Sequence, residues 1–231
     1  MNLLIATAVL PTIILLNYIN KKDEYEQEPK SLLIILFILG ILGVFITLVL
    51  TNFLSFFIDC TYLSESSTTL DKLINSFLVV ALVEEGIKYL FVYTVTWKNK
   101  NFNHVFDAIV YSVYVSLGFA TLENVLYAFN YGFATAILRG IISVPAHAFF
   151  AVFMGYYLSL AKLAKLKKNQ NGYRVSILKS ILYPIVIHGT FDFCLEIKTI
   201  PATILFFVLV FILYNTAFKK IKQFSEIKEM F

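Results

Sequence analysis

The sequence predicts an all-α fold, a polytopic membrane helical bundle with about seven transmembrane helices, and three observations support this prediction. The chain of 231 residues is 59% hydrophobic and only 15% charged, which leaves too little polar surface for a water-soluble globule. Its apolar residues fall in runs long enough to cross a bilayer. Its basic residues lie almost entirely in alternate connections between those runs.

The expected helices are apolar windows of about 20 residues between charged or polar breaks. In chain order they cover residues 3–19, 31–57, 73–97, 105–129, 137–161, 177–197 and 200–217. The first window is not followed by a small-residue cleavage site, so we expect a retained helix rather than a signal peptide. The fifth contains Arg139 and Pro145, which predict a tilted, kinked or re-entrant start. The helices are expected to form a single integral-membrane domain, residues 1–231, with its motifs in 73–197.

The distribution of basic residues predicts the orientation in the cell membrane. One set of connections holds only Lys72 and Lys198, whereas the other set and the C-terminal tail hold fourteen basic residues. The positive-inside rule places the larger set and the C-terminus in the cytoplasm, and the N-terminus outside. The formal charge of +4 then reflects flanks that face anionic lipid, so no nucleic-acid partner is expected. The fourteen are Lys21, Lys22, Lys30, Lys98, Lys100, Lys162, Lys165, Lys167, Lys168, Arg174, Lys219, Lys220, Lys222 and Lys228.

Two adjacent carboxylates, Glu84 and Glu85, lie near the middle of the expected span 73–97, with Lys88 one helical turn later. Each ionised side chain at the bilayer centre costs about 2.5 to 3.5 kcal/mol, so such a cluster requires a partner, a cavity or a reaction. A buried carboxylate can take a proton from water and return it to a leaving amine, as peptide hydrolysis requires. We therefore predict a catalytic role for the pair, with a purely structural ion pair to Lys88 as the alternative.

Further polar side chains occur in the fourth, fifth and sixth spans, at overlapping depth in the middle to outer half of the bilayer. They predict one buried site that opens outward. His147 and His188 are the histidines among them and are predicted to be catalytic, whereas His104 is expected to be solvated in a loop. The full set is Glu123, Asn124, Arg139, His147, His188 and Asp192.

Helical spacing supports this convergence. His188 and Asp192 are four residues apart and share a helix face, as do Glu84 and Lys88. Small residues also recur at four-residue intervals in spans four and five, which predicts close packing of these two helices. The two rows are Ser112, Ser116, Ala120 and Asn124, and Ser143, His147, Ala151 and Gly155.

Two mechanisms suit these groups. In the first, Glu84 or Glu85 activates water together with His147, while His188 and an amide or protonated acid stabilise the oxyanion. In the second, the histidines and a carboxylate hold Zn²⁺, and Glu84 or Glu85 is the general base. The sequence has no compact HExxH spacing and leaves both mechanisms open. The candidate metal ligands are His147, His188, Glu123 and Asp192.

Four residues are expected to support the site. Lys88 is a charge partner of the glutamates, and Asp192 is either a ligand or the group that orients His188. Arg139 is a structural cation or a clamp for a substrate carbonyl. Asn124, next to Glu123, is the fourth supporting residue.

These residues resemble the motifs of the PrsW family of bacterial intramembrane proteases, distant relatives of the CAAX prenyl protease and Abi group. The family's order is a double Glu with a following Lys, a Glu-Asn pair, an isolated His and a His-x-x-x-Asp. The matching segments are ALVEEGIKYL at 81–90, FDAIVYSVYVSLGFATLENVLY at 106–127, LRGIISVPAHAFFAVFMGYYL at 138–158 and IHGTFDF at 187–193.

The resemblance implies a peptidase, described in the family as a metallopeptidase or by analogy to glutamate-activated enzymes. It implies cleavage of single-pass membrane proteins near the extracytoplasmic face, with an anti-sigma factor as the expected substrate and its first, site-1 cut as the reaction. The rival interpretations of the buried Glu and His cluster are a transporter or proton relay and a catalytically silent peptide-binding membrane protein. The absence of an inverted repeat in the sequence argues against the transporter.

Overall fold

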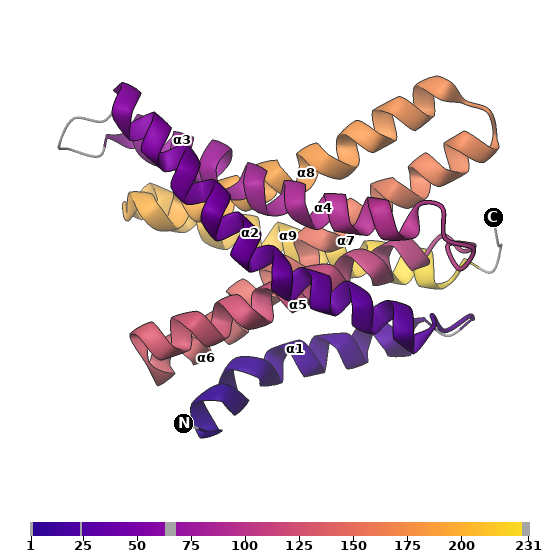
Figure 1. Ribbon diagram of the computed structural model, residues 1–231, viewed down its shortest axis with the longest axis horizontal. Coiled ribbons are helices and arrows are strands. Elements are labelled where there is room, and N and C mark those ends of the chain that lie inside the picture. The colour runs from indigo at the N-terminus through magenta and orange to yellow at the C-terminus, as the bar shows by residue number, and fades with distance from the viewer. Residues whose placement is uncertain (1, 24, 63–67, 228–231) are drawn as a thin grey trace.

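All regular elements are helices in the residues that the computed structural model describes, 2–23, 25–62 and 68–227 (Figure 1). The predicted all-α fold is therefore confirmed. The side chains of residues 2 and 59–62 and the predicted basic residue Lys228 lie outside this description. In chain order the helices are α1 Asn2–Lys22, α2 Lys30–Tyr62, α3 Thr69–Ile74, the π-helix η1 Asn75–Ala81, α4 Leu82–Thr96, α5 Asp107–Tyr131, α6 Phe133–Ile141, α7 Ser143–Leu166, α8 Gln170–Ile197 and α9 Ile200–Ser225.

Six helical segments of the described chain are long and apolar enough to cross a membrane. They correspond to six of the predicted spans and make the protein a multi-pass membrane protein. The remaining predicted span, 73–97, falls on α3, η1 and α4, which follow one another without interruption. The π-helix divides this stretch, so neither α-helical part reaches the length of a span.

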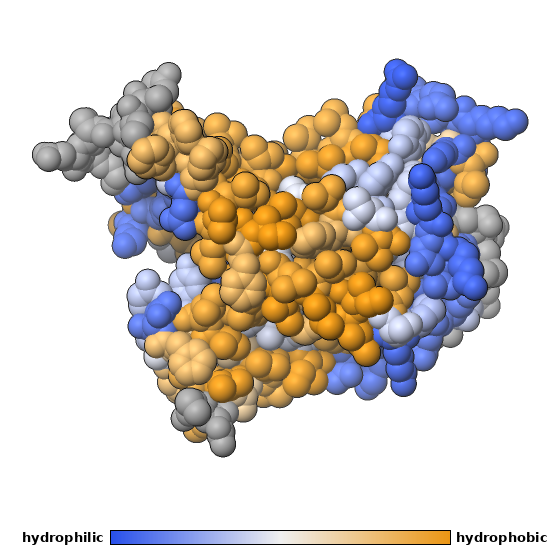
Figure 2. Space-filling model, in the orientation of Figure 1, coloured by the Kyte–Doolittle hydropathy of each residue, from blue (hydrophilic) through white to orange (hydrophobic). Residues whose placement is uncertain are grey.

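The bundle has two chemically different ends and an apolar belt between them. Figure 2 shows the belt across the middle of the molecule and a hydrophilic cap at the end where α9 finishes. We call this end the basic end, because the connections after α1, α4 and α7 and the last turn of α9 meet there with their lysines. The opposite end, where α2, α5 and α8 finish, is called the far end. Exposed apolar side chains on α2 and α9, such as Phe45, Val49, Phe207 and Phe211, form part of the belt.

Helix α5 is the centre of the bundle. Within its most apolar window 78% of the residues are buried, against 17% for α1 and for α9, so α5 is enclosed by protein and the outer helices face lipid. Close contacts of small residues hold its neighbours. A Cβ atom at Gly155 of α7 would lie 2.5 Å from the Cα of Ile109, and one at Gly118 of α5 would collide with the carbonyl of Phe37 in α2. The predicted close packing of spans four and five is confirmed.

The fifth predicted span is broken at Ile142, between α6 and α7, which confirms the expected kink. Pro145 has no N–H to donate to the carbonyl of Ile141, four residues earlier. The Tyr214 hydroxyl of α9 donates to that carbonyl instead, at 3.4 Å. The break turns α6 away from the line of α7, and Arg139 of α6 and His147 of α7 both reach the same cavity.

Replacement of Gly155 by alanine tests the α5–α7 contact. We expect Gly155→Ala to lower the free energy of unfolding by about 1–3 kcal/mol, because the added methyl group must displace the backbone of α5. Gly86→Ala is the matched control, since nothing lies within 4 Å of a Cβ atom there. Thermal unfolding of both variants in detergent micelles measures the difference, and equal stability would contradict this packing.

Candidate active site

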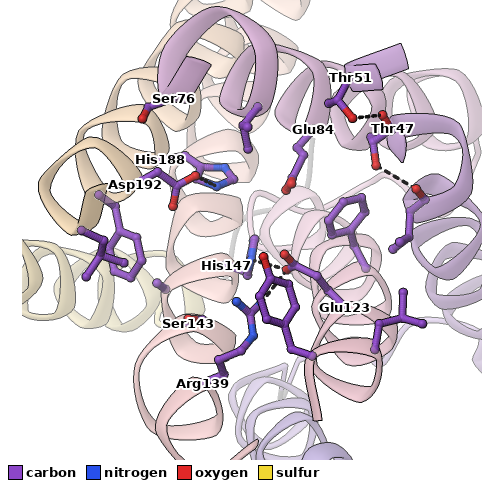
Figure 3. A pocket seen from close by; sticks show the side chains of 18 of the residues that line it. Thr47, Thr51, Ser76, Glu84, Glu123, Arg139, Ser143, His147, His188 and Asp192 are labelled. Carbon is purple, nitrogen blue, oxygen red and sulfur yellow. Dashed lines mark hydrogen bonds and ion pairs between the residues drawn. The ribbon is translucent and has the colours of Figure 1, made fainter. Parts of the chain in front are cut away.

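A cavity of about 720 Å³ lies among α2, η1, α4, α5, α6, α7 and α8 (Figure 3). Its wall includes Tyr131, the last residue of α5, and Lys198, which directly follows α8, and Figure 2 shows the molecule hollowed at that end. The cavity therefore opens at the far end and reaches inward between the helices. Its polar and charged wall includes Glu84, Glu123, Arg139, His147, His188, Asp192 and Glu196.

The two adjacent glutamates have different surroundings. Glu84 lines the cavity, and in Figure 3 its carboxylate points into it between α4 and the histidines. Glu85 is 0% exposed and lies behind this wall. The π-helix η1 ends three residues before Glu84, and its Phe77 ring packs against Gly189, where a Cβ atom would lie 2.6 Å from the ring. This contact brings α8, and with it His188, close to the glutamates.

Lys88 connects the glutamates electrostatically. Its ammonium group donates to Glu85 Oε1 at 2.7 Å and to Glu84 Oε2 at 3.1 Å, and its Nζ lies 3.3 Å from His147 Nδ1. The Phe119 ring centroid is 4.2 Å from the same Nζ. Lys88 is 1% exposed, so its charge is balanced by the protein rather than by water. The structure thus brings Glu85 to the same ammonium group as Glu84, which the sequence predicted to share a helix face with Lys88.

His188 has a carboxylate at each ring nitrogen. Its Nδ1 lies 2.9 Å from Glu85 Oε1, and its Nε2 lies 3.2 Å from Asp192 Oδ2. The Phe150 ring stacks on the imidazole with centroids 5.0 Å apart. These contacts fix the orientation of the ring, and Asp192 is the group that holds its outer side.

His147 has a similar arrangement on the opposite wall. Its Nε2 lies 3.1 Å from Glu123 Oε2, and the same oxygen forms an ion pair with Arg139 Nη2 at 2.9 Å. The Arg139 guanidinium packs on the Tyr127 ring, 3.8 Å from its centroid. The Ser116 hydroxyl donates to the backbone carbonyl of His147 at 2.8 Å and so ties this residue to α5.

Four potential metal ligands converge beside the cavity. One ligand atom each from Glu84, Glu85, His147 and His188 lies within 4.8 Å of the others, and all four residues are buried. Two imidazoles with carboxylates are an accepted donor set for zinc, and Glu85 Oε2 is buried without a hydrogen-bond partner. The residues present therefore fit a zinc ion. Lys88 bonds three of these four residues and would compete with a cation for them.

The converging set differs from the predicted ligand set. His147 and His188 belong to both, but the carboxylates that converge are Glu84 and Glu85. Glu123 and Asp192, which the sequence also offered as ligands, each bond a ring nitrogen of one histidine. Their geometry fits the role of an orienting partner, the alternative that the sequence analysis left open for Asp192.

Other predicted residues are also placed by the fold. Lys88, Arg139 and Asp192 adjoin the converging group. Asn124 points away from the cavity and donates to the carbonyl of Ala8 in α1 at 2.9 Å. His104 is 4% exposed rather than solvated, because the connection before α5 folds against the end of α9.

Glu196 is a cavity residue that sequence reasoning missed. Its carboxylate accepts hydrogen bonds from Asn75 Nδ2 at 3.3 Å and from Ser76 Oγ at 3.2 Å, which join α8 to η1 near the cavity mouth. The spacing carried a signal, because Glu196 follows His188 and Asp192 at further four-residue intervals on one face of α8. Because Glu196 lies at the end of the predicted sixth span, the sequence places it at the membrane surface rather than among the intramembrane polar residues.

A membrane bundle in which glutamates and histidines meet at a cavity belongs to the class of polytopic membrane enzymes, and comparison with known proteins names the family. The profile of the PrsW family intramembrane metalloproteases matches residues 28–217. Protease PrsW of Clostridioides difficile (strain 630) is 38% identical over 94% of this chain and 89% of its own length. The Geobacillus kaustophilus (strain HTA426) protein is 39% identical over 84% of this chain and 80% of its own.

Protease PrsW of Bacillus subtilis (strain 168) is 33% identical over 83% of this chain and 82% of its own length. No solved structure matches the chain. The chain belongs to the PrsW family, and the protein is an intramembrane protease. The resemblance seen in the sequence is confirmed, and the transporter interpretation is not favoured.

Removal of the Lys88 charge tests how far the site depends on the buried ion pairs. We expect Lys88→Met to lower the free energy of unfolding by about 3–5 kcal/mol, because Glu84 and Glu85 lose their shared cation. The double variant Lys88→Met/Glu85→Gln should recover part of that loss. Thermal unfolding measures both, with Lys100→Met as control because this lysine is exposed. Equal stability of Lys88→Met and Lys100→Met would contradict the pairing.

Proposed function

We propose that the protein hydrolyses a peptide bond of membrane-anchored protein substrates at the inner end of the cavity, with Glu84 as the general base. One observation carries this proposal: of the adjacent glutamates, Glu84 lines the cavity and Glu85 does not. A general base must reach both water and the scissile bond, and only a residue on the wall meets that requirement. Glu85 instead holds Lys88 and His188 in position from behind.

The other cavity residues are assigned from their contacts. Asp192 orients His188, and Glu123 orients His147, so both imidazoles present fixed nitrogens to the centre. Arg139 bonds Glu123 through Nη2, while its buried Nε has no partner. Arg139 lines the cavity and its buried N–H has no acceptor, which supports a role as the clamp for the substrate carbonyl. The proton that Glu84 takes from water would return to the leaving amine.

The proposed cofactor is Zn²⁺, held by His147, His188 and Glu85. When bound there, zinc would supply a Lewis acid that lowers the pKa of water. The family is described as metalloproteases, and the four converging residues offer a fitting donor set. In the absence of the ion, Lys88 offsets part of the negative charge of Glu84 and Glu85 through its two hydrogen bonds.

The proposed substrates are single-pass membrane proteins, cut near the extracytoplasmic face. The basic end carries the lysines that the positive-inside rule assigns to the cytoplasm, so the far end and the cavity mouth would face outward. A volume of about 720 Å³ is within the usual range of ligand pockets and suits an extended segment rather than a helix of about 10–12 Å diameter. The family resemblance supports site-1 cleavage of an anti-sigma factor as the physiological reaction.

Substitution of the proposed base should abolish cleavage. We expect Glu84→Gln to lower the rate at least about 100-fold while the protein stays folded, because the amide cannot accept the proton of water. His188→Ala should act in the same direction. The assay measures cleavage of a single-pass substrate by purified protein in detergent or lipid, with the exposed Glu226→Gln as the matched control. Normal cleavage by both Glu84→Gln and His188→Ala would refute the assignment.

Metal content separates the two mechanisms. We expect stoichiometric zinc in the purified protein, reduced in His147→Ala and His188→Ala because each loses an imidazole ligand, and retained in Glu84→Gln. Elemental analysis measures the metal, and a strong chelator should remove activity that added Zn²⁺ restores. Full activity in the chelator, without bound zinc, would instead select water activation by glutamate alone.

A further inference from the structure

A second group of buried carboxylates lies at the basic end, well away from the cavity described above. Asp23 and Glu28, in the connection between α1 and α2, are each 5% exposed, and Asp107, at the start of α5, is 0% exposed. The Glu28 carboxyl group is within reach of the Asp107 carboxyl group and the Tyr111 hydroxyl. Three acidic groups from two parts of the chain are thus removed from water together.

No lysine or arginine among the described residues lies within 4.0 Å of these carboxylates. The nearest ionisable base is His104, whose Nδ1 is 4.0 Å from Asp107 Oδ1. Its hydrogen bonds indicate a neutral ring. Nδ1 accepts from the Phe106 N–H at 3.2 Å, so Nε2 carries the hydrogen and donates to the Ile227 carbonyl at 2.7 Å. Among the described residues, no lysine or arginine therefore makes a direct ion pair with this group, although Lys30 lines the adjoining cavity and Lys162 interacts electrostatically with Asp107 at longer range.

Three buried oxygen atoms in this region have no hydrogen-bond partner, namely Glu28 Oε2, Asp107 Oδ1 and Asn103 Oδ1. The neighbouring atoms of the Asp107 and Asn103 side chains already have hydrogen-bond partners. Asp107 Oδ2 accepts from the backbone N–H groups of Asn103 at 3.0 Å and His104 at 2.6 Å. Asn103 Nδ2 donates to Glu26 at 3.1 Å, which fixes the amide and leaves its oxygen unpaired. Buried acceptors without donors call for a ligand that accepts their lone pairs.

The titration behaviour agrees with this geometry. Burial raises the pKa of Glu28 to about 7 and that of Asp23 to about 6, and repulsion from Asp23 and Glu26 raises the pKa of Glu28 further. Hydrogen bonds from the backbone and from Tyr111 stabilise the ionised forms only in part. A bound cation would supply the missing positive charge.

We propose that Glu28, Asp107 and Asn103 form a binding site for a divalent hard cation, Ca²⁺ or Mg²⁺, at the basic end of the bundle. The donors are carboxylate and amide oxygens, which these ions prefer, and no thiolate or available imidazole is present for zinc. An adjoining cavity of about 260 Å³, lined by Asp23 and Glu28, provides the route from solvent. The ion ties the α1–α2 connection to the α4–α5 connection and to the first turn of α5.

Cation-dependent thermal unfolding of the purified full-length protein tests this site. Divalent ions are first removed from the protein, and excess Zn²⁺ is then added back so that the candidate active site keeps the same metal content. CaCl2 or MgCl2 alone is then titrated into the protein at pH 7.5 in detergent micelles. We expect one of the two salts to raise Tm by at least about 2 °C in the wild type and in the exposed control Glu226→Gln. Glu28→Gln and Asn103→Ala should lose most of this rise.

Isothermal titration calorimetry with the same salts provides a readout that does not depend on unfolding. It should give one site in the wild type, and an affinity at least about tenfold weaker in Glu28→Gln. Equal Tm rises in wild type and Glu28→Gln would overturn the proposal by showing a nonspecific salt effect.

A cation-independent wild-type Tm would overturn it as well and would assign a shared proton to the carboxylates. In that case the raised folded pKa values of Asp23 and Glu28 stabilise the protein below the unfolded pKa values of about 4. Stability would then fall as the pH rises through about 6 and 7.

Discussion

The buried ion pairs of Lys88 with Glu84 and Glu85 are the constraint on which the rest of the structure depends. A group of charges inside an apolar bundle persists only where every member has a partner at hydrogen-bond distance. Glu85 extends the network to His188, and Lys88 extends it to His147. Three helices, α4, α7 and α8, are therefore held in one register by electrostatics at their centre rather than by apolar packing alone.

The backbone irregularities of the fold lie next to this network. The π-helix η1 ends just before Glu84, and the break between α6 and α7 lies five residues before His147. At each irregularity a neighbouring residue accommodates the departure from regular α-helix. Gly189 leaves room for the Phe77 ring of η1. The Tyr214 hydroxyl donates to the Ile141 carbonyl, which lacks its helical donor. Helix α5, which is buried over most of its length, gives these irregular segments a surface to pack against. The close helix contacts at glycines thus also help to position the polar groups of the cavity.

The buried carboxylates have different partners in the cavity and at the basic end of the bundle. In the cavity, every carboxylate of the central network bonds a lysine, an arginine or a histidine. At the basic end, Glu28 and Asp107 are also buried, but no lysine or arginine among the described residues pairs with them, and the neutral His104 ring lies 4.0 Å from Asp107. Burial alone therefore does not distinguish the roles of acidic residues in this protein. The charge and hydrogen-bond pattern around each carboxylate does.

The sequence by itself determined the membrane class, the helix order and most of the residues that meet at the cavity, because apolar length and the cost of intramembrane charge are local properties. Four-residue spacing also sufficed to pair His188 with Asp192 and Glu84 with Lys88. Only the tertiary structure decided which glutamate reaches the cavity, that Asn124 faces α1, and that Glu123 bonds His147. These outcomes depend on helix rotation and on contacts between residues far apart in the chain, which spacing within one helix does not fix.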